Sequence, residues 1–176
     1  MVIAVLAAIG GLTGCGAREG TITGGQAALA ADENSAAFLD RISSQDRVSE
    51  NDATRGILMV LEGRDTAQTF KQRVQTLRNK RIVPVGADLE AGRSITRGTL
   101  AYMIYQACKI PGGVILHLAG PSERYCLREL QYRNMMREGF AQTPVNGMEF
   151  VEALTKAEVY RRTGKVPDRA GQIEGE

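Results

Sequence analysis

The feature that most constrains this fold is the stretch 94–110, which combines a helix start, an apolar stripe and a stop. Thr96 is a favourable N-cap residue, and Pro111 with Gly112 ends the segment. The apolar residues between them recur at spacings of three and one, which places them on one helical face. They are Leu100, Met103, Ile104, Ala107 and Cys108. The pattern predicts an amphipathic helix that begins after Thr96.

A similar start recurs on both sides of this helix. Val145–Asn146 stands where Ile95–Thr96 stands, at an offset of 50 residues, and another apolar helix follows it. On the N-terminal side, Ser49 takes the cap position of a helix expected to run to Leu61. Asp52 lies three residues after Ser49, as in a capping box with Asp in place of Glu. The start of this helix therefore occurs three times.

The N-terminal copy has two competing registers. Thr54–Gly56 is identical in sequence to Thr96–Gly98, but that match excludes Ser49 as the counterpart of Thr96. We favour the register set by Ser49, because it explains the capping pattern.

Two further helices are expected between the capped ones, over residues 66–80 and 122–138. The resulting unit is helix, loop, helix, with a period of about 50 residues that is typical of repeat architectures. The apolar run Val114–Ala119, bounded by glycines, is expected to form a short β segment or a buried extended connector. We predict a mainly α domain of about three degenerate units over residues 36–162, beginning with a short amphipathic helix that includes Phe38 and Ile42.

Residues Ile95-Thr96-Arg97 resemble the ITRAE start of the second helix of S-layer homology modules, with Gly98-Thr99 in place of Ala-Glu. The resemblance covers roughly residues 66–110 and, more weakly, 122–160. It implies a pseudo-trimeric helical domain that binds cell-wall polysaccharide, with Arg97 as a candidate ligand-binding residue. A role for Arg97 at the helix cap explains its position equally well.

The N-terminus carries a short apolar run, Val2–Ile9, followed by Leu12-Thr13-Gly14-Cys15. This tetrapeptide resembles the lipobox of bacterial lipoproteins, which implies a signal peptide over residues 1–14 and lipidation of Cys15. The run is shorter than the roughly 20 residues that span a bilayer. It also lacks a preceding Lys or Arg, so a short buried N-terminal segment is the alternative.

If Cys15 is lipidated, the protein is anchored to a membrane of the bacterial envelope, which would be the outer membrane facing the periplasm in a Gram-negative cell. Residues 15–35 are rich in Gly and Ala and are expected to be a flexible tether. Residues 163–176 are polar and are expected to form a disordered tail.

Charge and motifs exclude several function classes. The net charge is +2, from 22 basic and 20 acidic side chains of interspersed sign, which argues against a nucleic-acid partner. The sequence contains no phosphate-binding loop, CxxC, HExxH or GxSxG pattern. We therefore predict no catalytic site, metal or cofactor.

The single histidine and two cysteines have alternative interpretations. His117 could pair with Cys108 or Cys126 in a nucleophilic site, but a histidine among aliphatic residues is more often packed. Cys108 and Cys126 are candidates for a disulfide in an oxidising compartment. Two free core thiols are the other interpretation.

Arg124 and Arg128 lie four residues apart and share a helical face, on which they could bind a carboxylate or phosphate of an envelope polymer. The alternative is that they form intramolecular ion pairs that brace the helix. The sequence as a whole predicts a non-catalytic, membrane-anchored envelope lipoprotein that binds cell-wall or envelope polymer. The alternative function is an accessory protein-binding subunit of an envelope complex.

Overall fold

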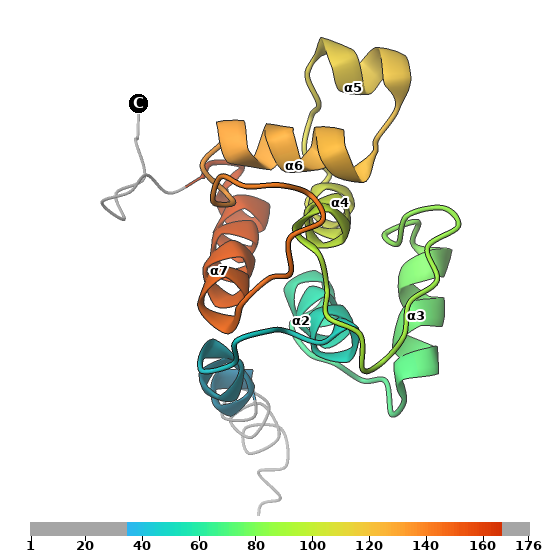
Figure 1. Ribbon diagram of the computed structural model, residues 1–176, viewed down its shortest axis with the longest axis vertical. Coiled ribbons are helices and arrows are strands. Elements are labelled where there is room, and N and C mark those ends of the chain that lie inside the picture. The colour runs from blue at the N-terminus through green and yellow to red at the C-terminus, as the bar shows by residue number, and fades with distance from the viewer. Residues whose placement is uncertain (1–34, 167–176) are drawn as a thin grey trace, which may run out of the picture.

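The computed structural model describes residues 35–166, which form a mainly α globular domain without a sheet (Figure 1). A helix covers residues 35–43. The others are α2 (Glu50–Glu62), α3 (Phe70–Asn79), α4 (Arg97–Ala107), α5 (Val114–Ala119), α6 (Glu123–Tyr132) and α7 (Gly147–Thr163). The predicted signal peptide, Cys15 and all of the predicted tether before residue 35 lie outside the described residues, as does the predicted tail beyond residue 166.

The three predicted caps are confirmed. The side chains of Ser49, Thr96 and Asn146 each accept a hydrogen bond from the backbone N–H three residues later, at the start of α2, α4 and α7. Thr54 lies inside α2, so the register set by Ser49 is the correct one. The Ser49 hydroxyl donates to Asp52 Oδ2 at 2.8 Å, so Asp52 contacts the side chain of the cap residue and is not the reciprocal partner of the predicted capping box.

The residues before the three caps meet in a closed ring of backbone hydrogen bonds. The N–H of Ile95 donates to Val48 O at 2.9 Å, that of Val48 to Val145 O at 2.9 Å, and that of Val145 to Ile95 O at 3.1 Å. All three side chains are fully buried. The ring therefore satisfies the buried backbone groups of three segments that are far apart in the sequence, and it fixes where α2, α4 and α7 begin.

Helices α3 and α6 are shorter than predicted. Helix α3 begins at Phe70 and not at Thr66 as predicted, because Thr69 and Gln72 form a complete capping box. The end of α6 moves from Glu138 to Tyr132 because Asn134 has a φ of 56°, a left-handed conformation that ends a helix.

The predicted β segment at Val114–Ala119 is wrong, because these residues form helix α5. An extended segment would need a partner strand for its backbone groups, whereas a helical turn satisfies them locally. The N–H of His117, for example, donates to Gly113 O at 3.2 Å. His117 is exposed rather than packed.

The helices surround one core, and every helix contributes to it. Among the described side chains of α5, only Leu116 belongs to the core. Helix α2 packs against α3, α4 and α7, and α4 packs against α6. The helix at residues 35–43 contributes Phe38 and Ile42 to the core, as predicted. Figure 1 shows α6 lying across the end of the bundle and α5 standing out beyond it.

Candidate functional site

Arg97, the candidate from the family resemblance, is bound inside the domain. Its Nε and Nη2 donate to Glu149 Oε1 and Oε2 at 2.6 and 2.8 Å, which is a bidentate pair between the first turns of α4 and α7. The Arg97 side chain is 16% exposed and that of Glu149 is 2% exposed. This guanidinium therefore forms an intramolecular ion pair and is not available to a ligand.

Arg97 also holds the loop between α6 and α7. Arg97 Nη1 donates to Glu138 O at 3.2 Å. A Cβ on Gly139 would lie 1.7 Å from the same nitrogen, so the loop can approach Arg97 this closely only at a glycine. The loop is thereby held beside the first half of α7.

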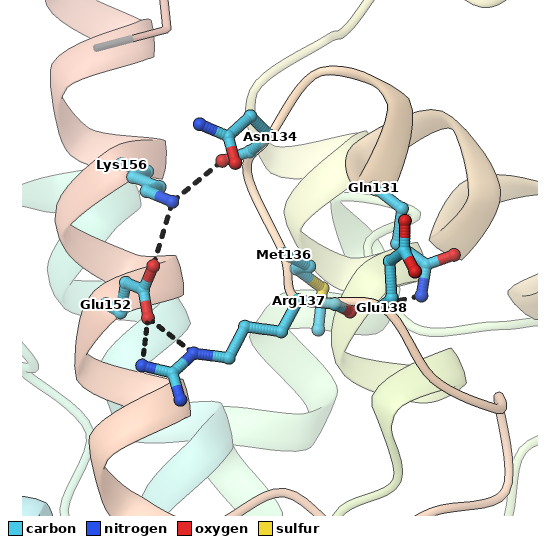
Figure 2. A pocket seen from close by; sticks show the side chains of 7 residues that line it. All are labelled: Gln131, Asn134, Met136, Arg137, Glu138, Glu152 and Lys156. Carbon is cyan, nitrogen blue, oxygen red and sulfur yellow. Dashed lines mark hydrogen bonds and ion pairs between the residues drawn. The ribbon is translucent and has the colours of Figure 1, made fainter. Parts of the chain in front are cut away.

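A polar pocket of about 530 Å³ lies between this loop and α7 (Figure 2). Figure 2 shows Arg137 reaching from the loop to Glu152 on α7, with Lys156 one turn further along that helix. The walls carry two acids, two bases, two amides and one thioether. They are Gln131, Asn134, Met136, Arg137, Glu138, Glu152 and Lys156.

Ion pairs fix one wall of the pocket. Glu152 accepts from Arg137 Nε at 2.9 Å and from Lys156 Nζ at 2.9 Å. The hydrogen bond from Lys156 is the largest influence that lowers the pKa of Glu152, and Arg137 adds to it. Lys156 also donates to Asn134 O at 2.7 Å. This carboxylate is therefore ionised and engaged at neutral pH.

Two polar side chains of the pocket make no interaction with another described residue. They are the amide of Asn134 and the carboxylate of Glu138, which the loop holds only through their backbone oxygens. An amide can both donate and accept, and a carboxylate accepts. With a formal charge that sums to zero, the pocket suits a neutral polar ligand rich in hydroxyl groups better than an ion.

Arg124 and Arg128 lie on exposed positions of α6, and neither forms the predicted bracing ion pair with another residue of the described range. The nearby acid Glu129 pairs with Arg133 instead, at 2.7 Å. Arg128 lines a groove between α5 and α6, whereas Arg124 does not. The structure therefore separates Arg97 from Arg128 and places them in different environments.

Cys108 and Cys126 are free, buried thiols. Cys108 Sγ contacts Ala157 O on α7 at 3.6 Å, while Cys126 lies in α6, which packs against α4. Burial raises the pKa of each thiol to about 12. Both thiols are therefore neutral at physiological pH, which makes them poor nucleophiles.

Alkylation of the folded protein tests this environment. We expect iodoacetamide at pH 8 to leave Cys108 and Cys126 unmodified in buffer and to modify both in urea, because burial restricts access and disfavours the thiolate. Intact-mass measurement of the chain from residue 16 onward reports the number of adducts. Rapid modification of either thiol in buffer would contradict the buried environment.

Within residues 35–166, no group of three acidic, histidine or cysteine side chains is placed to hold a metal ion. None of the helices in that range is both long and apolar enough to cross a membrane. Comparison of the chain with protein-family models, curated proteins and solved structures finds no match.

Sequence reasoning named none of the residues that line the pocket as site residues, Asn134 and Glu138 included, and it also missed Glu149, the partner of Arg97. One signal was present, because Asn is common in the left-handed position that ends a helix, and the loop geometry begins there. Glu149 carried no such signal, since its partner Arg97 lies 52 residues away in the sequence.

Proposed function

We propose that this protein is a non-catalytic, membrane-anchored lipoprotein of the bacterial cell envelope whose helical domain binds a cell-wall or envelope polysaccharide. The single observation that carries the proposal is the polar pocket between the α6–α7 loop and α7. The anchor is the lipidated Cys15 that the sequence predicts.

The proposed domain organisation is S-layer homology-like, with three degenerate helix–loop–helix units. The ring formed by Val48, Ile95 and Val145 supports it, because equivalent residues of three units would meet in this way around a pseudo-threefold axis. The tails of α3 and α6 add support. Ile82 N–H donates to Leu77 O, and Met135 N–H donates to Leu130 O, across a left-handed residue in each case.

The chemistry of the pocket supports a sugar ligand. Sugar hydroxyls both donate and accept, and the free amide of Asn134 and free carboxylate of Glu138 offer the complementary groups. The ion pairs of Glu152 hold one wall in place, so little side-chain entropy is lost when a ligand binds. In this proposal Arg97 is a positioning residue that holds the loop.

The absence of catalysis is also a proposal. The neutral, buried thiols of Cys108 and Cys126 argue against a cysteine nucleophile. His117 lies on the exposed helix α5, away from the core that holds both thiols.

Co-sedimentation with purified cell-wall sacculi tests the proposal. Glu138→Gln removes the free carboxylate, and Asn134→Gly removes the amide while allowing the left-handed backbone. We expect each change to weaken binding by about fivefold to tenfold, as for the loss of one hydrogen bond in a ligand site. The chain from residue 16 onward is titrated with sacculi over a salt series.

The matched control is Glu158→Gln, which changes an exposed acid further along α7, outside the polar pocket. It should pellet like the unaltered chain. Failure of the unaltered chain to pellet would refute polysaccharide binding. Pelleting unaffected by Glu138→Gln and Asn134→Gly would remove this pocket from the proposal.

A second candidate function is an accessory subunit that binds protein in an envelope complex. It is favoured by the exposed apolar side chains of α5 and the adjacent end of α6, where Val114, Leu118 and Tyr132 are at least three-quarters exposed. Such a surface is typical of a contact with another protein.

A further inference from the structure

The groove between α5 and α6 differs in chemistry from the polar pocket. Its volume is about 530 Å³, and most of its walls are apolar or aromatic. Tyr125, Arg128 and Tyr132 follow one another at spacings of three and four, so they form a single stripe along α6. The lining residues are Gly113, Val114, Leu116, Tyr125, Arg128, Glu129 and Tyr132.

The apolar surface continues out of the groove onto α5. Val114 is 75% exposed, Leu118 84% and Tyr132 88%. Only Leu116 of α5 is buried among the side chains described for this helix. Helix α5 contacts α6 and stands out from the body of the domain (Figure 1). Its side chains Val114 and Leu118 are exposed.

The charges beside this surface are unbalanced. Arg128 lines the groove, and Arg124 lies one turn earlier on α6. Neither forms an ion pair within the described range. The acid in the groove, Glu129, is already paired with Arg133. The surface thus offers two available cations next to apolar and aromatic side chains, a combination that is common at the centres of protein interfaces.

These properties discriminate among possible occupants. Exposed aliphatic side chains do not suit a hydroxyl-rich polysaccharide, because they cannot bond its hydroxyl groups. In a symmetric dimer through this surface, the same arginines of two copies would lie at one interface, where like charges repel. A partner protein with apolar side chains and carboxylates avoids both conflicts.

We propose that the groove between α5 and α6 is a docking site for a protein segment that places an apolar side chain against Val114 and Tyr132 and a carboxylate against Arg128. This site is separate from the polar pocket, and the inference rests on the second candidate function. Val114 and Tyr132, which line the groove, supply the apolar contact, and exposed Leu118 lies beside it, one turn after Val114 on α5. Arg128 supplies orientation through a charge-assisted hydrogen bond.

Photo-crosslinking in intact cells of the source organism tests the proposal. The full-length protein carries p-benzoylphenylalanine in place of Leu118, and a matched control carries it in place of Met148, an exposed apolar residue on α7. We expect a protein adduct from position 118 and none from 148, with mass spectrometry locating the attachment in a segment that holds apolar and acidic residues. Arg128→Glu should lower the yield by about tenfold.

The results distinguish two claims, that the groove binds a protein and that the bound segment is acidic. Replacing the identified acidic residue of the partner by lysine should restore the adduct yield of the Arg128→Glu variant. This rescue also shows that the Arg128→Glu variant is folded. A protein adduct whose yield does not respond to Arg128→Glu would overturn the acidic partner while leaving a protein-binding role. Adducts only with lipid or with a second copy of the chain, or no adduct from position 118, would overturn both.

Discussion

Replacing Arg97 by alanine is expected to lower the free energy of unfolding by about 3–5 kcal/mol, the range for breaking one side of a buried ion pair. The substitution leaves the carboxylate of Glu149, which is 2% exposed, without its bidentate partner. It also removes the donor that holds Glu138 O and with it the loop between α6 and α7. Urea unfolding of the chain from residue 16 onward, followed by circular dichroism, measures the loss.

Two further variants test whether the loss of stability comes from the unpaired buried charge or simply from the absence of an arginine. Arg137→Ala breaks an exposed pair with Glu152 and should cost less than about 1 kcal/mol. Arg97→Met combined with Glu149→Leu removes both charges and should recover much of the loss, because no buried charge is left unpaired. A loss below about 1 kcal/mol for Arg97→Ala would show that Glu149 is not buried as described.

The expected stability loss also bears on the resemblance to S-layer homology modules. Arg97 matches the arginine of the module start, yet its guanidinium is taken up by Glu149 and the loop. A weaker wall interaction of Arg97→Ala would therefore report a displaced loop rather than a lost ligand contact. The variants at Asn134 and Glu138 are the direct test of the pocket, because those side chains are free.

Local signals made part of the fold predictable. The caps Ser49, Thr96 and Asn146 each act within one helical turn, so their effect depends only on residues close in the sequence. The same is true of the apolar stripe of α4, all of which is buried, although α4 also buries residues off the stripe, such as Ala101 and Tyr102, and is therefore not the amphipathic helix that the pattern predicts. The starts of α2, α4 and α7 and part of the buried surface of the central helix were therefore accessible from the sequence.

The remaining features depend on contacts between distant segments. The identification of Val114–Ala119 as a β segment failed because apolar content alone does not distinguish a short strand from a short helix. The pairing of Arg97 with Glu149, which lie 52 residues apart in the sequence, joins the starts of two helices that are brought together at the ring of backbone hydrogen bonds. The pocket likewise forms only after that ring places the α6–α7 loop against α7.

The largest effect that we expect from a single added side chain is at Gly147, where α7 begins close to the end of the helix at residues 35–43. Gly147, at the start of α7, donates its N–H to Gln45 O at 2.8 Å. A Cβ at this position would lie 1.8 Å from Ile42 O, which is a backbone atom that cannot move aside without displacing the helix at residues 35–43. Gly147→Val should therefore destabilise the domain by at least about 3 kcal/mol through overpacking and loss of this bond.

Gly92→Ala is the matched control, because a Cβ there meets nothing within 4 Å. It should leave stability unchanged or raise it slightly, since alanine restricts the unfolded chain. Hydrogen exchange adds a local readout: in Gly147→Val, amides of residues 35–43 should lose protection first, because their helix is the element that must move. Equal protection in both variants would mean that the close approach of Gly147 to Ile42 O does not hold the helix at residues 35–43 in place.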